Sequence, residues 1–164
     1  MQSQLISASE TFTASPTSSA TEARVLGGVD GVPRLLLRLE GALVLLAGLA
    51  AWSHEGGSWP WFVGLFLVPD LSMLGYLHSP RIGAALYNAG HSYVLPGVLA
   101  ALAITLGVHA LLPPAKVVAL TQAAILWVAH IGFDRLMGYG LKYETRFVDT
   151  HLGQVGRKSA QTAS

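Results

Sequence analysis

Four long apolar segments, separated by short polar turns, constrain this chain more than any other feature. They cover residues 35–53, 59–77, 82–112 and 115–138. Each one reaches the roughly 20 residues that an α-helix needs to cross a bilayer. The chain is 52% hydrophobic and only 12% charged, whereas an average soluble domain is about 25% charged. We therefore predict an all-α integral membrane protein built as a four-helix bundle.

The third segment, over residues 82–112, is too long for one straight span. One prediction is a single helix kinked at Pro96, because a proline ring disrupts the hydrogen bond to the carbonyl four residues earlier. The alternative is a short interfacial helix followed by a span that begins at Val94. The choice decides whether His91 lies inside the membrane or near its surface.

The two ends of the chain differ from the apolar segments. Residues 1–32 are rich in Ser, Thr and Ala, and they lack the basic start and apolar core of a secretory signal. We predict a disordered tail over residues 1–32 and another over residues 154–164. Residues 33–153 then form the transmembrane domain together with a C-terminal segment.

Basic residues are distributed unequally between the two sides of the predicted bundle. With four spans, one side holds both tails and the turn at 78–81, and it carries nine of the 10 basic residues. The other side carries only Lys116. Because cytoplasmic loops collect Lys and Arg, we expect a multi-pass protein of the cytoplasmic (inner) membrane with both termini inside.

Ionisable residues within the apolar segments are the main indication of function. Asp70 lies in the second segment, His91 in the third, and His130 and Asp134 lie one turn apart in the fourth. A charge in hydrocarbon costs at least about 2.5–3.5 kcal/mol, so such residues usually serve a purpose. At a rise of about 1.5 Å per residue, Asp70, His130, Asp134 and Glu40 of the first segment fall in the cytoplasmic half of the membrane. His91 falls there only if the third helix is continuous. We expect a polar site there.

A divalent metal site is the leading interpretation of this polar group. Neutral imidazoles and carboxylates suit zinc or a related ion, and two side chains four residues apart on a helix can converge on one ion. The predicted ligands are His91, His130, Asp134 and Asp70. A bound metal would make a nucleophile of a water molecule, with Asp70, Asp134 or Glu40 as the general base. The protein would then be a membrane-embedded hydrolase acting on a lipid or another amphiphile.

Other interpretations remain open, and the sequence does not decide whether the protein is an enzyme. Haem would be held between His91 and His130. A proton or ion path would pass through Asp70, His130 and Asp134. In a non-enzymatic protein, the same residues would serve helix packing or the binding of a partner or cofactor.

The segment after the fourth helix is too polar to span the membrane. Its aromatic residues recur every four positions, which indicates a short amphipathic helix with one apolar face: Tyr139, Tyr143 and Phe147. One prediction folds this segment back over the cytoplasmic mouth of the bundle, close to Asp134. The alternative lays it on anionic lipid through Lys142 and Arg146. The residues predicted to support the site are Tyr76, Tyr87, Asn88, Asp149 and His151.

Composition excludes several classes of protein and suggests the partners. The chain has no cysteine, which excludes disulfides, thiolate catalysis and Cys-ligated zinc. A net charge of +1 without a basic stripe gives no case for nucleic-acid binding. The expected partner is the lipid bilayer. A homo-oligomer is left open, because three glycines recur every seven residues and allow close helix packing within or between chains: Gly83, Gly90 and Gly97. A small amphiphilic ligand is also left open.

Several motifs taken together resemble a known family. They are RLEG at 38–41, PDLSMLGY at 69–76, ALYNAGHSYVLP at 85–96, AHIGFDRLMGYGLKY at 129–143 and FVDTHLG at 147–153. This combination resembles the domain of unknown function 4260 (DUF4260), a family of small membrane proteins, over about residues 34–153. The resemblance implies an integral membrane protein and carries no established activity.

The Pro69-Asp70 pair is also similar to a motif of YdjM-type membrane-bound metal-dependent hydrolases. Those proteins combine a Pro-Asp pair with histidines in transmembrane helices. Here Ser72 stands where a second aspartate of that motif is expected, and the histidines are spaced differently.

Overall fold

The computed structural model of the chain describes residues 28, 29 and 31–155. The tails predicted over 1–32 and 154–164 lie for the most part outside the described residues. Within them, four stretches are long and apolar enough to cross a membrane: Val32–His54, Trp59–Leu77, Pro80–Val108 and Pro114–Met137. The predicted all-α membrane bundle is confirmed at this level.

The described chain forms α2 (Val32–His54), α3 (Trp59–Leu65), the 3₁₀ helix η1 (Val68–Leu77), α4 (Pro80–Gly90), α5 (Val94–Val108) and α6 (Pro114–Met137). A proline stands in the first turn of α2, α3, η1, α4 and α6. The first turn tolerates proline because its N–H groups have no partner within the helix. The prolines therefore mark where most of the helices begin.

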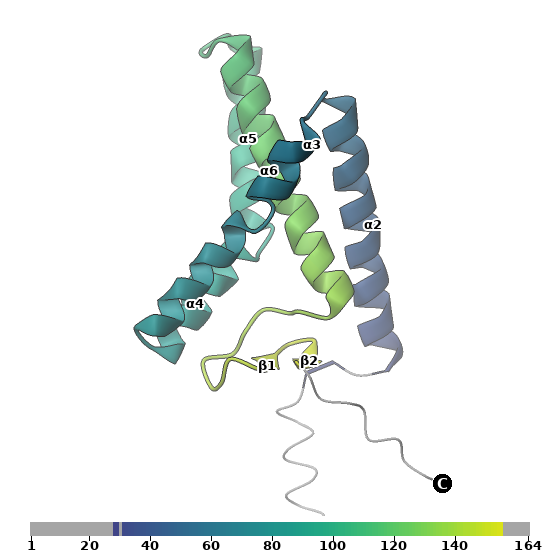
Figure 1. Cartoon of the computed structure of the whole chain (residues 1–164), viewed down its shortest axis with the longest axis vertical. Helices are drawn as coiled ribbons and strands as arrows, with labels where there is room; N and C mark the ends of the chain where they lie inside the picture. The colour runs from purple at the N-terminus through teal and green to yellow at the C-terminus, as the bar shows by residue number, and fades with distance from the viewer. Residues whose placement is uncertain (1–27, 30, 156–164) are drawn as a thin grey trace, which may run out of the picture.

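The four spans run alternately up and down, with α3 and η1 together forming the second and α4 and α5 the third (Figure 1). Helix α6 packs against both α2 and α5, while α4 lies beside η1 as a hairpin that leans away from α2. The turn at 78–79 and the C-terminal segment lie at one end, and the turns at 55–58 and 109–113 lie at the other. Successive turns therefore lie at opposite ends of the molecule, as four membrane spans require.

Large apolar side chains cover the outside of the helices. Leu43 is 67% exposed, Val63 73% and Val108 75%. Such a surface suits contact with lipid chains rather than with water. The bilayer is therefore the partner that the described surface supports.

Two of the spans are interrupted, and for the third the structure has the helix start at Val94 that was one of the two predictions. Helix α4 ends at Gly90 and α5 begins at Val94, so the third span breaks at residues 91–93 and is not kinked at Pro96. Pro96 lies in the first turn of α5, where its missing N–H costs nothing. The second span changes from α3 to η1 just before Pro69, whose ring blocks a continuous α-helix through this point.

The amphipathic helix expected over residues 139–147 does not form. Gly138 adopts a left-handed conformation with φ 89° and ends α6, as is common at helix C-termini. The chain then runs extended, with a bridge between Lys142 and Thr150 and a short antiparallel ladder of β1 (Asp149–Thr150) and β2 (Gly153–Gln154). The segment folds back onto α4, because the Asn88 amide binds both the carbonyl and the N–H of Lys142, at 2.8 and 2.7 Å.

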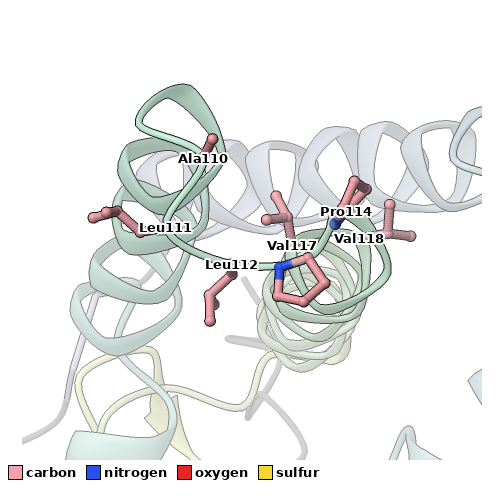
Figure 2. A pocket seen from close by; sticks show the side chains of 8 residues that line it. Ala110, Leu111, Leu112, Pro114, Val117 and Val118 are labelled. Carbon is pink, nitrogen blue, oxygen red and sulfur yellow. The ribbon is translucent and has the colours of Figure 1, made fainter.

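A hollow of about 630 Å³ lies at the opposite end of the molecule, around the turn between α5 and α6 (Figure 2). Apolar side chains, prolines and a glycine line it. Because it has no ionisable lining residue, this hollow offers no group for catalysis or metal binding.

Candidate metal centre

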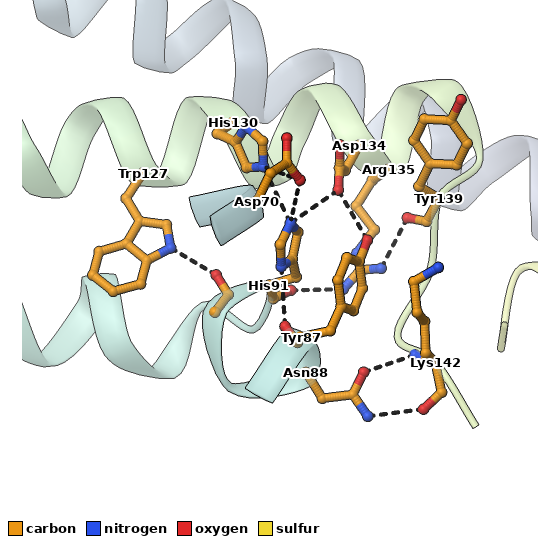
Figure 3. A network of polar contacts seen from close by, with 11 residues as sticks. Asp70, Tyr87, Asn88, His91, Trp127, His130, Asp134, Arg135, Tyr139 and Lys142 are labelled. Atoms are coloured by element: carbon orange, nitrogen blue, oxygen red, sulfur yellow. Dashed lines mark hydrogen bonds and ion pairs between the residues drawn. The ribbon is translucent and has the colours of Figure 1, made fainter. Parts of the chain in front are cut away.

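Four ionisable side chains from three separate elements meet inside the bundle (Figure 3). Asp70 comes from η1, His91 caps the C-terminus of α4, and His130 and Asp134 come from one face of α6. Each offers one ligand atom, and these atoms all lie within 4.8 Å of one another. The four residues predicted as metal ligands are therefore brought together by tertiary packing.

The individual distances within this cluster are short. The Nε2 atom of His91 lies 3.2 Å from Oδ1 of Asp70, 3.4 Å from Oδ2 of Asp134 and 3.2 Å from Nε2 of His130. The His130 Nε2 atom lies 3.6 Å from Asp70 Oδ1. Carboxylate oxygens and unprotonated imidazole nitrogens are all acceptors. Acceptors that converge in this way repel one another unless a proton or a cation lies between them.

Tyr87 orients two of the four side chains. Its carbonyl lies 3.0 Å from Nδ1 of His91, and because a carbonyl only accepts, Nδ1 carries the hydrogen and Nε2 of the neutral ring is free to bind. Metal-ligating histidines are commonly fixed by such a bond. The Tyr87 ring also stacks on His91 at 3.8 Å, and its hydroxyl donates to Oδ2 of Asp134 at 3.1 Å.

The His130 ring also packs against an aromatic side chain outside the cluster. It is 1% exposed, and the edge of its ring meets Phe66 at a centroid distance of 5.2 Å. Its Nδ1 atom has no hydrogen-bond partner among the described residues. An unpaired buried polar atom costs about 1–3 kcal/mol. A strong interaction at Nε2, such as a bond to a cation, would offset that cost.

The cluster is most exposed on the side of Asp70. The side chains of His91 and His130 are each 1% exposed and that of Asp134 is 9% exposed, whereas that of Asp70 is 27% exposed. Asp70 is therefore the member that faces the surroundings. Glu40, the remaining predicted catalytic residue, lies on the exposed surface of α2 and outside this cluster.

Two residues of α6 hold the broken third span in place. The guanidinium of Arg135 donates to the carbonyls of His91 and Tyr139, both at 3.0 Å. The indole of Trp127 donates to the carbonyl of Gly90 at 2.6 Å. Carbonyls at a helix end need partners outside the helix. These roles were not predicted from the sequence, although Trp127 precedes His130 by three residues and so lies on the same face of the helix, which is a usable signal.

A buried lysine lies next to the cluster. Lys142 is 7% exposed, its Nζ atom donates to the Phe147 carbonyl at 2.8 Å, and it lies 4.8 Å from the ring centre of Tyr87. Burial lowers the pKa of this ammonium, and the charges of Asp134 and Asp70 oppose that shift. The prediction that Lys142 rests on anionic lipid is wrong, because the side chain points inward.

The other predicted supporting residues lie farther from the ligands. The Tyr76 ring packs against Phe147 at 5.1 Å, and its hydroxyl has no partner in the described part of the chain. Asp149 binds the side chains of Thr145 and Arg146. His151 accepts the N–H of Leu141 at Nδ1, and burial together with the Arg135 charge lowers its pKa. These contacts hold the C-terminal segment together and do not reach the cluster.

Comparisons with known proteins place the chain in a family without assigning an activity. No curated protein and no solved structure matches the chain, and the likeness to YdjM-type hydrolases has no support. A family model described as domain of unknown function (DUF4260) matches residues 34–155. Since this match covers most of the chain, the protein belongs to the DUF4260 family.

Proposed function

We propose that this protein binds one divalent metal ion, most suitably zinc, within the membrane and uses it to hydrolyse an amphiphile. The convergence of His91, His130, Asp70 and Asp134 within 4.8 Å carries the proposal. Ligands at about 2.0–2.1 Å around a tetrahedral ion lie about 3.3 Å from one another. The Nε2 atom of His91 lies 3.2 Å from that of His130 and 3.4 Å from Oδ2 of Asp134, close to that spacing. Oδ1 of Asp70 lies 3.2 Å from the same His91 atom, and all separations among the four ligand atoms are within 4.8 Å.

The difference in burial suggests separate roles for the two carboxylates. Catalytic zinc sites commonly have three protein ligands and an open position for water. We assign His91, His130 and Asp134 as the permanent ligands, because they are the most buried members. Asp70 faces the open side and would take a proton from the water. A metal held by the three ligands would supply a nucleophilic water for attack on an acyl carbonyl, and Asp70 would return the proton to the oxygen of the alcohol that leaves when the acyl–oxygen bond breaks.

Metal analysis of detergent-purified protein tests this proposal. We expect about one zinc ion per chain in the wild type, and its loss in the His130→Ala and Asp134→Asn variants. Asp70→Asn should keep the metal and lose hydrolysis of a long-chain ester. His109→Ala is the matched control, because His109 is exposed at the far end of α5. Folded, monodisperse wild-type protein that takes up no zinc would overturn the proposal.

That negative result would favour the non-enzymatic alternative, in which the cluster serves packing or partner binding. Interhelical hydrogen bonds in membranes contribute about 0.6 kcal/mol on average. His130→Ala would then lower stability and change no metal content.

The haem and proton-path interpretations fit the geometry less well. The two imidazole nitrogens face each other at 3.2 Å with both carboxylates beside them, so no space remains for a macrocycle between the rings. In the outer half, the hydroxyls of Thr105 and Thr121 bind carbonyls of their own helices. They therefore do not extend the polar cluster toward that side.

We also propose that the protein lies in the inner membrane with both termini in the cytoplasm. Among the described basic residues, Arg34, Arg38, Arg81, Arg135, Lys142 and Arg146 belong to one end and Lys116 to the other. The absence of native cysteines allows a direct test. In intact cells, an impermeant maleimide should label Glu55→Cys and spare Glu144→Cys. The reverse pattern would overturn the orientation.

A further inference from the structure

An apolar groove of about 410 Å³ lies between η1, α5 and α6. This volume falls within the roughly 300–1,000 Å³ of ligand pockets. Leu65, Leu99, Ala123 and Leu126 contribute to its walls. Unlike the hollow of Figure 2, this groove lies near the His–Asp cluster.

The groove lies next to the backbone that carries two cluster residues, although none of the four cluster residues lines it. Pro69 and Gly90 line the groove, and the residues that follow them are Asp70 and His91. Trp127 also lines it, one helical turn before His130, and Figure 3 shows its indole beside the cluster. A molecule in the groove would therefore lie close to the segments that carry Asp70, His91 and His130.

Two further observations indicate what occupies the groove. Leu65 is 42% exposed and Val68 49% exposed, and both lie on the apolar helix surface that contacts the bilayer, so the groove opens toward lipid. Ser72 lines the groove, and its buried hydroxyl has no hydrogen-bond partner in the described residues. That hydroxyl could bind one polar atom of an occupant, but most of the other lining side chains are apolar, so a solute with several polar atoms would bury most of them without partners, which is costly.

We infer that this groove binds one acyl chain of an amphiphile whose oxygen-bearing head group lies at the His–Asp cluster, an assignment that rests on the proposed metal site. The chain would enter from the bilayer, where acyl chains are the surrounding solvent. The head group would approach the cluster from the side of Asp70. The substrate class is thus a long-chain acyl compound rather than a soluble ester.

Quenching of Trp127 fluorescence by a dibrominated long-chain fatty acid tests this inference. Bromine quenches an indole that it contacts. The exposed Trp59 and Trp61 are replaced by phenylalanine, and Trp52, which is 3% exposed, stays as an inaccessible reference. In nanodiscs of unbrominated lipid, we expect saturable quenching of Trp127 at low mole fractions of the probe.

Two substitutions on α6 form the matched pair for this assay. Ala123 lines the groove and Ala119 does not, and both are exposed on the same helix. Ala123→Phe should weaken probe binding at least about tenfold, whereas Ala119→Phe should leave it unchanged. His130→Ala should weaken it about tenfold as well, because the carboxylate head loses its cation. Equal, non-saturable quenching in the two alanine variants would overturn the inference, and so would unchanged affinity in His130→Ala.

Metal content measured on the same samples separates this inference from the proposed function. Loss of saturable quenching in Ala123→Phe with zinc retained supports both. Non-saturable quenching of zinc-loaded wild-type protein overturns the acyl-chain assignment and leaves the metal site standing. Saturable quenching of wild-type protein that takes up no zinc overturns the proposed function and, with it, the placement of the head group.

Discussion

Tyr87 provides the most selective test of the cluster, because one side chain supports two of the proposed ligands in different ways. Its ring stacks on His91 at a centroid distance of 3.8 Å and an interplanar angle of 10°, and its hydroxyl donates to Asp134 at 3.1 Å. Tyr87→Phe keeps the ring and removes only the hydroxyl. His91 should therefore stay in place while Asp134 loses its partner.

Two independent estimates give the size of the effect. Loss of a hydrogen bond to a metal ligand typically weakens metal affinity 10–100-fold, which corresponds to about 1.4–2.7 kcal/mol at 25 °C. A hydrogen bond to a charged group contributes about 1.5–3 kcal/mol. The Tyr87 hydroxyl meets a carboxylate that is 9% exposed, so water cannot readily replace it. We expect the Kd for zinc to rise about 10–100-fold.

Competition for zinc against a chromogenic chelator, with protein in detergent, measures this change. Tyr76→Phe is the control, because it removes a hydroxyl that has no hydrogen-bond partner in the described residues. That variant should keep the wild-type Kd. An unchanged Kd in Tyr87→Phe, or an equal rise in both variants, would refute the assignment of Asp134 as an oriented ligand.

Three further predictions concern the surroundings of the cluster. Gly132→Ala should lower the midpoint of thermal unfolding, because its Cβ would lie 2.7 Å from a backbone nitrogen of α2 and overpacking costs about 1–3 kcal/mol. Gly97→Ala, with nothing within 4 Å, is its control, and equal midpoints would contradict the close contact. Asn88→Ala removes both bonds to the Lys142 backbone and should speed limited proteolysis within residues 143–148; an unchanged rate would show that other contacts hold the segment. Burial holds the pKa of His151 below its ordinary 6.5, so the folded form keeps the imidazole neutral while the unfolded chain takes up a proton. Protection of the C-terminal segment from hydrogen exchange should be full above about pH 6.5 and fall as the pH drops toward the lower folded-state pKa; a pH step that persists in His151→Gln would refute this origin.

The spans and the cluster members could be predicted from the sequence for a physical reason. Hydrocarbon penalises every charge, so Asp70, His91, His130 and Asp134 stand out against their apolar neighbours without knowledge of the fold. The four spans confirm the length argument. Glu40 is also a charged residue within an apolar segment, yet it lies outside the cluster. Position along a helix gives the depth of a residue in the membrane but not the direction in which its side chain points.

The irregular parts of the backbone could not be predicted in the same way. The aromatic spacing of residues 139–147 favours a helix, but the left-handed Gly138 ends α6 and Asn88 then binds the extended chain at Lys142. That contact joins residues 54 positions apart. Local periodicity carries no information about such a partner. The burial of Lys142 follows from the same contact, and composition alone favours placing a lysine on the membrane surface.

The break in the third span is stabilised by the same helix that supplies two of the proposed ligands. In a continuous helix, the carbonyls of Gly90 and His91 would bind N–H groups four residues later, and freeing them inside a membrane costs several kcal/mol each. Trp127 binds the first carbonyl and Arg135 binds the second, so the break is held by α6. His130 and Asp134 lie between these two residues on the same helix. Helix α6 therefore supplies two of the proposed ligands. It also supplies the two hydrogen bonds that hold the third ligand, His91, against them. The position of the cluster is thus set by α6, and substitutions at Trp127 or Arg135 should act on metal affinity through His91.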